Sequence, residues 1–363
     1  MRQVIKARAA VLLEPGQDPQ LTDVELRDPV GDEVLVRIEA VGICHTDITM
    51  AALSGRTPMV FGHEGAGTVV AVGPQARRRV GERVVLTFAS CGACDNCTHE
   101  RPAYCDQSTN LNMRGSRRDE TSALRLDGAP ITGGFFGQSS FATHAIAGSR
   151  NAVPLPDGFD PVLAAPLGCS VQTGVGAVLN VIGPVPSIAV FGAGAVGLSA
   201  VMGARIAGAK TVIAVDPLAE RRALAAELGA TITLDPTAGD AAAEIMSLTG
   251  GVAGAVDTTA RPDVIASAVG VLASRGTLAV LGLGAPTAEV PVTLIMAKGL
   301  TVRGVVEGDS DPQVFIPQLA RWHAAGELPL EKLVSSYAFD DFGAAWAAAK
   351  AGTAIKPVLL TGS

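Results

Sequence analysis

Residues 187–197 read Ser-Ile-Ala-Val-Phe-Gly-Ala-Gly-Ala-Val-Gly, a short apolar run that leads directly into a G-x-G-x-x-G sequence. The alanine-rich residues 198–209 that follow are typical of a helix. A second apolar run, 211–215, ends at Asp216, which stands 24 positions after Gly192. This order of strand, glycine loop, helix, strand and acid predicts the first half of a dinucleotide-binding sheet.

Glycines at these positions allow a tight turn and let a pyrophosphate approach the N-terminus of the following helix. The hexapeptide alone is a weak signal in a chain that has 42 glycines, but the strand before it and the helix after it strengthen the prediction. The candidate residues for binding the dinucleotide here are Gly192, Gly194, Ala195, Val196, Gly197, Asp216 and Arg221.

The acid at the end of the second strand favours NAD as the dinucleotide. The carboxylate of Asp216 can accept hydrogen bonds from both ribose hydroxyls and would repel a 2′-phosphate. Arg221 and Arg222 lie nearby and weaken the exclusion of NADP. An alternative is that Asp216 only caps a helix, since Pro217 follows it.

The rest of the chain falls into two kinds of pattern. After Asp216, strand-like and helix-like stretches keep alternating up to about residue 304, which predicts a parallel sheet with helices on both faces. Residues 1–40 are β-rich, and 34–40 partly alternate in polarity, the pattern of a strand with one wet face. We therefore expect an α/β fold: a Rossmann-type doubly wound domain at 171–304, inserted in a β-rich catalytic domain made of 1–170 and 305–363.

Composition limits the classes of function. The chain has 363 residues, of which 48% are apolar and 17% charged, enough to bury the cores of two domains. A formal charge of -7 argues against a nucleic-acid partner. No apolar run is long enough to span a membrane, and residues 1–14 do not resemble an export signal. We expect a cytoplasmic protein with neither a nucleic-acid nor a membrane partner.

Four of the six cysteines lie within fifteen residues, in the spacing C-x2-C-x2-C-x7-C. Four thiolates complete a tetrahedral zinc site with no open position, so this lobe, at about 88–108, is predicted to be structural. An iron–sulfur cluster is the main alternative, and four unrelated buried cysteines are a further one. The predicted ligands are Cys91, Cys94, Cys97 and Cys105.

A second metal site is predicted from the remaining cysteines, Cys44 and Cys169. Between them lies His63, in the stretch Gly62-His63-Glu64-Gly65-Ala66-Gly67. Two thiolates and one imidazole leave a fourth position open, which is typical of catalytic zinc. Zinc in such a site acidifies a bound alcohol, and a dinucleotide accepts the hydride that the ionised alcohol releases.

Taken together, these motifs and Gly42-Ile43-Cys44-His45-Thr46-Asp47 resemble the zinc-dependent medium-chain alcohol dehydrogenases over the whole chain. Within that family, 135–144, 166–174 and 304–310 are similar to bacterial aryl (benzyl) alcohol dehydrogenases. The resemblance implies a GroES-like catalytic domain, two zinc ions per chain, NAD, and a homodimer or homotetramer. It implies oxidation of a primary aryl or allylic alcohol, such as benzyl alcohol, to the aldehyde.

The resemblance also implies roles around the catalytic metal. Cys44, His63 and Cys169 would ligate zinc. Asp47 would orient His63 from behind, and Glu64 would sit behind the metal. For Asp47 a helix cap, and for Glu64 a simple salt bridge, are the alternatives.

Other roles concern the substrate proton and the cofactor. Thr46 would hydrogen-bond the alcohol oxygen and begin the proton relay. Thr49 stands where many members have a relay histidine, so the proton must leave by another route. His45 and Lys356 would meet the cofactor pyrophosphate, and Thr173 would lie against the nicotinamide.

Phe135 and Phe136 are the candidates for the wall of the substrate pocket. Two alternatives to the overall function stay open: a formaldehyde- or polyol-type dehydrogenase, and a relative that binds zinc and nucleotide without turnover. Cys169 argues against the polyol type, which often has a carboxylate as its third ligand.

Overall fold

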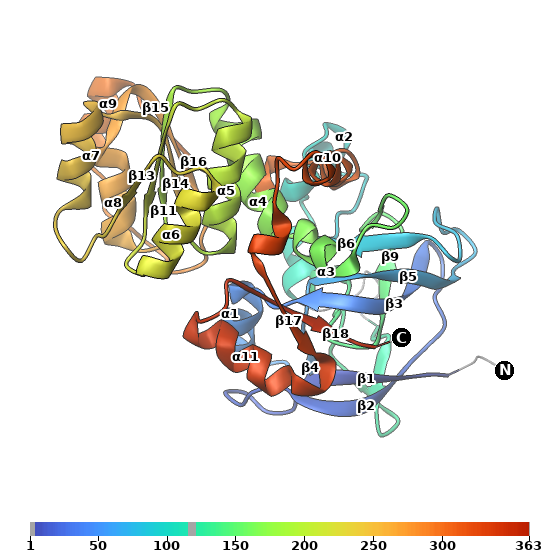
Figure 1. The fold of residues 1–363 in the computed structure, drawn as a ribbon. Helices are drawn as coiled ribbons and strands as arrows, with labels where there is room; N and C mark the ends of the chain where they lie inside the picture. Colours follow the sequence, from blue (N-terminus) through green and yellow to red (C-terminus); the bar gives the residue numbers. More distant parts are fainter. Residues whose placement is uncertain (1–3, 115–120, 363) are drawn as a thin grey trace. The chain divides into compact units, whose positions relative to one another are not determined.

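The computed structural model describes residues 4–114 and 121–362, and the chain forms two compact units (Figure 1). Unit 1 consists of Met1–Cys169, Asp311–Ala324 and Leu333–Ser363. Unit 2 consists of Ser170–Ser310 and Ala325–Lys332. Unit 2 is thus an insertion in unit 1.

The boundaries differ from those expected at 170 and 305. Residues 305–310 belong to unit 2. The hydroxyl of Ser310 donates a hydrogen bond to the side-chain oxygen of Gln172 at 3.2 Å, which connects this segment to helix α4 (Ser170–Gly176) of that unit. Residues 325–332 also return to unit 2, where Lys332 pairs with Glu227 at 3.1 Å.

Unit 1 is built on two sheets that share one apolar core. The five-stranded sheet has the order β4 (Met59–Val60), β1 (Ile5–Leu12), β2 (Gln20–Leu26), β7 (Leu124–Leu126), β8 (Ala129–Ile131). The seven-stranded sheet has the order β10 (Ala152–Pro154), β6 (Arg83–Leu86), β5 (Glu64–Val72), β3 (Glu33–Gly42), β18 (Lys356–Leu360), β17 (Val334–Ala338), with β9 (His144–Gly148) paired to β3. The C-terminal strand β18 pairs antiparallel with β3, which brings the tail back to the first part of the chain.

The partial alternation predicted for residues 34–40 is largely confirmed. Val34, Val36, Ile38 and Ala40 are fully buried, whereas the side chains of Arg37 and Glu39 are 42% and 22% exposed. Leu35 is the exception, because it is also buried.

Helices and short turns complete unit 1. The helices are α1 (His45–Leu53), α2 (Asp95–Thr98), α3 (Pro161–Ala164), α10 (Pro312–Ala324) and α11 (Phe342–Ala351). The short 3₁₀ or π-helical segments are Pro102–Tyr104, Thr109–Met113, Phe135–Gly137, Ala165–Gly168 and Phe339–Asp341. Phe141, Phe342 and Trp346 pack ring against ring and attach α11 to the core.

Unit 2 contains a fully parallel sheet, and its Rossmann-type fold confirms the predicted class (Figure 1). Its strand order is β13 (Ile232–Leu234), β12 (Thr211–Val215), β11 (Ser187–Phe191), β14 (Val252–Asp257), β15 (Leu272–Val280), β16 (Thr301–Gly304). The order of the strands along the chain changes direction between β11 and β14. Sheets of this type bind dinucleotides at that point. The helices are α4 (Ser170–Gly176), α5 (Ala195–Ile206), α6 (Ala219–Leu228), α7 (Ala241–Thr249), α8 (Pro262–Gly270) and α9 (Val292–Lys298), with short helical segments at Ala177–Ile182, Glu307–Asp309 and Leu330–Lys332.

Within the described residues, no single helix has the length and apolarity needed to cross a membrane. One bent pair, 161–168 with 170–182, reaches the required length and composition only when the two helices are counted together.

Candidate metal and coenzyme sites

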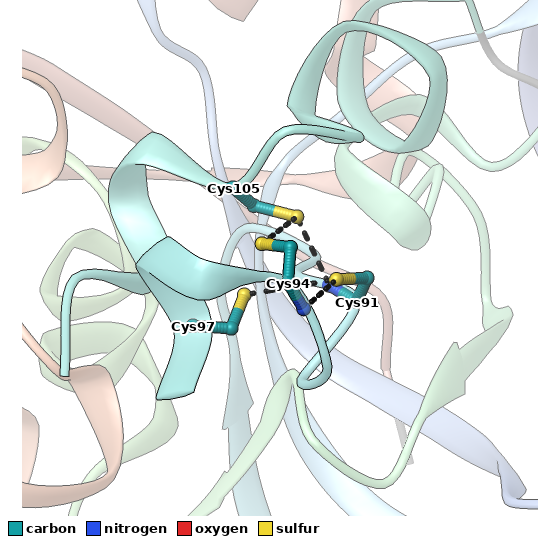
Figure 2. Close-up of side chains that lie close together, drawn as sticks. All are labelled: Cys91, Cys94, Cys97 and Cys105. Carbon is teal, nitrogen blue, oxygen red and sulfur yellow. Dashed lines mark hydrogen bonds between the residues drawn. The ribbon is translucent and has the colours of Figure 1, made fainter. Parts of the chain in front are cut away.

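The clustered cysteines converge on one point, and Figure 2 shows their four side chains together. One sulfur atom of each lies within 4.8 Å of the other three. Two of the sulfur pairs are 3.9 Å apart, close to the ~3.8 Å spacing expected for a tetrahedral site with zinc–sulfur bonds of about 2.3 Å. All six cysteines of the chain are free, so disulfides do not explain the approach.

Backbone N–H groups point at these sulfur atoms, as they do around metal-bound thiolates. The amide of Cys94 donates to the Cys91 sulfur at 3.2 Å, and the amide of Cys91 donates to the Cys105 sulfur at 3.2 Å (Figure 2). Burial raises the pKa of the Cys91 thiol, but the backbone donors of Ala93 and Cys94 outweigh it and bring that pKa to about 6. The lobe therefore favours thiolate at Cys91 and fits a closed zinc site.

The second cluster brings together residues that lie far apart in the chain. Ligand atoms of Cys44, His63, Glu64 and Cys169 all lie within 4.8 Å of one another. Cys44 follows β3 at the start of α1, and His63 directly precedes β5. The cluster thus contains the three predicted ligands and also the carboxylate of Glu64. Because this carboxylate lies as close as the other ligand atoms, Glu64 is a fourth candidate ligand.

Cys169 reaches the cluster because the turn before it lies against β6. The hydroxyl of Thr87 donates to the carbonyl of Gly168 at 2.7 Å. A methyl group at Gly168 would overlap the carbonyl of Leu86, so only glycine permits this approach.

Asp47 holds both sides of the cluster. Its Oδ2 accepts the backbone N–H of Cys44 at 2.9 Å, and its Oδ1 accepts that of Gly62 at 3.1 Å. Oδ1 also lies 2.8 Å from Nδ1 of His63, and both side chains are fully buried. Asp47 is the third residue of α1, not its cap, since the helix begins at His45.

The ring of His63 is poised for a ligand on its other side. Nε2 is buried and has no hydrogen-bond partner in the described part of the chain. Burial lowers the pKa of His63, but the carboxylate of Asp47 and the thiol of Cys44 together raise that pKa well above its usual value. A hydrogen bond with Cys169 lowers the pKa of Cys44 well below that of an ordinary thiol. A buried imidazole nitrogen that makes no hydrogen bond within the described residues, beside two thiols of which Cys44 is acidified, fits a zinc site.

The two predicted pocket residues pack around this histidine. Phe136 stacks on His63 with ring centroids 4.5 Å apart, and Phe135 meets the ring edge-on at 5.7 Å. Phe135 is 0% exposed and also packs on Phe61, so it lies in the core and faces no open pocket here. A wall of the substrate site could therefore involve only Phe136 of this pair.

Gln138 is a site residue that sequence reasoning missed. Its side-chain amide donates to the carbonyl of His63 at 2.8 Å and accepts the N–H of Gly65 at 3.2 Å. It thus fixes the backbone on both sides of Glu64. The available signal in the sequence was a glutamine among phenylalanines, in Phe135-Phe136-Gly137-Gln138-Ser139-Ser140-Phe141.

Lys356 has a different partner from the predicted pyrophosphate. Its ammonium lies 2.7 Å from Oε1 of Glu64 and donates to the carbonyl of Ile43 at 3.3 Å, and the side chain is 2% exposed. Burial alone would lower the pKa of Lys356, but the charge of Glu64 raises it above its usual value. A phosphate contact would require this buried ion pair to break, so the structure supports a structural role.

In unit 2, the three glycines of the loop have three different environments. Gly192 has a φ of +91°, and a methyl group at Gly197 would overlap the Gly192 carbonyl. At Gly194, the residue before α5, an added methyl group would meet nothing within 4 Å. The outer two glycines thus make the turn and the tight packing, and the middle one leaves open space for a phosphate. Ala195 and Val196 supply the first backbone N–H groups of α5.

The predicted ribose acid lies next to that loop. Oδ2 of Asp216 accepts the N–H of Ala193 at 2.7 Å, and Oδ1 accepts that of Leu218 at 2.9 Å. Arg221 lies 3.9 Å from Oδ2 of Asp216. Asp216 thus closes the turn before α6, but it does not cap that helix, whose N-cap is Leu218 without a side-chain hydrogen bond, so the alternative interpretation as a helix cap was wrong.

The remaining predicted residues are placed less decisively. His45 is exposed and Thr46 half-buried on the first turn of α1, which follows Cys44. Thr173 lies on α4, and its hydroxyl is 3.4 Å from Oε2 of Glu307. Glu307 is a second residue that sequence reasoning did not assign.

The folds of the two units and the two cysteine clusters define a zinc-binding dehydrogenase. Residues 31–157 match the family model described as alcohol dehydrogenase GroES-like domain, and 195–323 match that described as zinc-binding dehydrogenase. The chain belongs to the zinc-dependent medium-chain alcohol dehydrogenase family, and the GroES-like and Rossmann-type pairing predicted from the sequence is confirmed.

Individual relatives match over nearly the full length. The chain is 48% identical to a geraniol dehydrogenase of Castellaniella defragrans, covering 98% of each chain. A solved structure of an alcohol dehydrogenase zinc-binding domain protein from Burkholderia ambifaria has 43% identity and a TM-score of 0.96, over 99% of this chain and 100% of that one. Benzyl alcohol dehydrogenase from Acinetobacter calcoaceticus has 37% identity and a TM-score of 0.95, with the same coverage.

Proposed function

We propose that this alcohol dehydrogenase oxidises a primary aryl or allylic alcohol to its aldehyde with NAD, using one catalytic and one structural zinc per chain. The observation that carries the proposal is the convergence of Cys44, His63 and Cys169, with Nε2 of His63 lacking a partner within the described residues. The separate four-cysteine lobe supports the second zinc.

The chain's own residues have distinct tasks in this proposal. Bound zinc would act as a Lewis acid toward the alcohol oxygen. Cys44, Cys169 and Nε2 of His63 would hold the ion, and Asp47 keeps the imidazole in the required tautomer and orientation. Thr46 would hydrogen-bond the alcohol and take its proton toward solvent, since Thr49 offers no imidazole for a relay.

The coenzyme proposal rests on unit 2. Gly194 leaves room for a pyrophosphate at the start of α5, and Asp216 lies beside the loop where the adenosine ribose would bind. The carboxylate of Asp216 favours NAD over NADP. His45 remains a proposed phosphate contact and Thr173 a proposed nicotinamide contact.

Two relatives support the substrate class by their names, a geraniol dehydrogenase and a benzyl alcohol dehydrogenase. The apolar rings next to His63 are consistent with an unsaturated substrate, because Phe136 presents an aromatic surface at the metal ligand.

We also propose a homodimer or homotetramer that associates through the sheet of unit 2. Its edge strand β16 exposes all four of its residues. Unpaired edge strands are ready templates for pairing with a second chain. Size-exclusion chromatography with light scattering would test this assembly.

One experiment separates the candidate functions. Zinc content would be measured on the same preparation that is assayed with benzyl alcohol, geraniol, short aliphatic alcohols, polyols and formaldehyde, each with NAD and NADP. Two zinc ions with a preference for NAD and unsaturated alcohols support the proposal. A preference for polyols or formaldehyde would support the alternative dehydrogenases. One zinc and no turnover would support a non-catalytic relative.

A further inference from the structure

The side-chain amide of Gln138 binds three backbone groups in the interior of unit 1. Its nitrogen donates to the carbonyl of His63 at 2.8 Å and to the carbonyl of Thr87 at 3.3 Å, and its oxygen accepts the N–H of Gly65 at 3.2 Å. The side chain is 2% exposed. One buried amide therefore connects the backbone of a proposed zinc ligand to the residue that follows β6.

The amide lies where the hydrogen bonds between β5 and β6 end. The last pair of this antiparallel ladder is Ala66 with Val85. Past that pair, the N–H of Gly65 and the carbonyl of Thr87 both bind the amide of Gln138. A carboxamide donates and accepts hydrogen bonds as a peptide unit does, so this side chain continues the bonding of the sheet beyond its last pair.

Thr87 extends the connection to another proposed ligand. Its hydroxyl donates to the carbonyl of Gly168 at 2.7 Å, and Gly168 directly precedes Cys169. Thr87 is 0% exposed. A path of two buried side chains thus joins the backbone of His63 to the backbone beside Cys169, although these two ligands are far apart in the sequence.

The surroundings of the amide are closely packed. A methyl group at Gly65 would lie 3.2 Å from Oε1 of Gln138 and 2.6 Å from Cβ of Ser140. A methyl group at Gly137 would lie 2.7 Å from Cβ of Ala89. Because two of these distances are too short for any side chain, both positions require glycine, and the place of the amide is closely defined.

The loop that carries Gln138 has an unfavourable backbone conformation. Phe136 and Ser139 both have positive φ, at 50° and 56°. The hydroxyl of Ser139 donates to the carbonyl of Val60 at 2.7 Å and so holds the loop in place. Strained positions that persist in a packed structure often mark functional sites. Here the strained loop brings Phe136 onto the ring of His63 and Gln138 onto its carbonyl.

We infer that Gln138 is a positioning residue of the catalytic metal site. Acting through Thr87, it fixes the distance between His63 and Cys169. The inference rests on the proposed role of these two residues as zinc ligands. A metal binds more tightly where its ligands already have the required geometry, because ordering them then costs little free energy. Asp47 orients the ring of His63, whereas Gln138 holds its backbone.

The test compares zinc release by the wild-type protein and by Gln138→Met, a variant of similar side-chain length that has no amide. Release to a colorimetric chelator is followed in time, and the phase that is absent from Cys44→Ser is assigned to the catalytic site. We expect this catalytic phase to become about tenfold faster in Gln138→Met, since the backbone of His63 loses a fixed partner. Release from the four-cysteine lobe should change by less than about twofold.

Asn112→Leu is the matched control. Asn112 is also 2% exposed, and its side-chain amide binds both backbone groups of Ala89, at 2.7 and 3.0 Å. Its partners in the described part of the chain are Ala89 and Ser108, which are not proposed ligands of the catalytic zinc. Urea unfolding should show that both variants are destabilised, whereas only Gln138→Met should release catalytic zinc faster.

A second variant keeps the test decisive if Gln138→Met does not fold. Thr87→Val removes the hydroxyl at the other end of the path with little change of shape and leaves the carbonyl of Gly168 without that donor. The same acceleration of the catalytic phase is expected.

A catalytic phase with the wild-type rate in the folded variant, or an equal acceleration in Asn112→Leu, would overturn the inference and leave the proposed function intact. If the wild-type protein itself lacks the phase that Cys44→Ser removes, the proposed catalytic zinc site and this inference both fail.

Discussion

Oδ1 of Asp47 lies 2.8 Å from Nδ1 of His63, and neither side chain has any exposed surface. The same carboxylate accepts the backbone N–H of Cys44, so one residue connects two candidate ligands that belong to different elements. Because Nδ1 is occupied in this way, Nε2 is the nitrogen that remains for a metal. The geometry of the candidate catalytic site thus depends on a residue that is not one of its proposed ligands.

Asp47→Asn should lower the affinity of the catalytic zinc by about 10- to 100-fold, the range seen when a partner of a metal-bound histidine is lost. Zinc retained after dialysis against a graded series of chelator concentrations would measure this. Asp95→Asn is the control, because Asp95 is exposed and lies beside the other cluster. Equal zinc retention by the two variants would contradict the role given to Asp47.

Cys44→Ser should remove one zinc per chain and lower kcat/KM with benzyl alcohol by at least about 100-fold, because a Lewis acid is lost. Cys97→Ser should also remove one zinc, but its first effect should be on stability, since structural zinc contributes to folding. Elemental analysis and thermal unfolding of the two variants would show the contrast. Full zinc content and turnover in Cys44→Ser would refute the ligand assignment.

Lys356→Met should lower the free energy of unfolding by about 3–5 kcal/mol, because it leaves the buried carboxylate of Glu64 without its cation. Combining it with Glu64→Gln should recover part of that loss, since the unpaired charge is then removed. Urea unfolding of zinc-loaded protein gives the comparison. Weaker NAD binding with unchanged stability would instead favour the pyrophosphate contact predicted from sequence.

Gly194→Ala and Gly197→Ala should have opposite effects. An added methyl group meets nothing within 4 Å at Gly194, so stability should be kept, but it occupies the space where a phosphate would approach and should weaken NAD binding by about tenfold or more. At Gly197 the methyl group overlaps the carbonyl of Gly192, which should cost about 1–3 kcal/mol of stability. Calorimetric Kd values and thermal midpoints of the two variants test this pair of expectations. Similar profiles for both would contradict the distinct environments of the two glycines.

Several features of this protein could be predicted from sequence because short stretches of chain determine them. The glycine loop, the helix that follows it and the four-cysteine lobe each depend on turns and ligands within a few residues of one another. The alternation of strands and helices also predicted the parallel sheet of unit 2, because each strand and each helix has its own pattern in a short stretch of sequence. The partial alternation of residues 34–40 likewise predicted that Arg37 and Glu39 are more exposed than their apolar neighbours in β3.

Tertiary structure alone decided which distant side chains became partners. Lys356 and Glu64 are 292 positions apart, and their ion pair exists because β18 returns to lie beside β3. Glu307 reaches Thr173 only because a strained turn packs against α4. His63 was recognisable from its glycine-rich stretch, but burial and the contact with Asp47 make it a poised ligand. Local sequence determines turn geometry and ligand type, whereas burial and pairing over long separations depend on the packing of the whole chain.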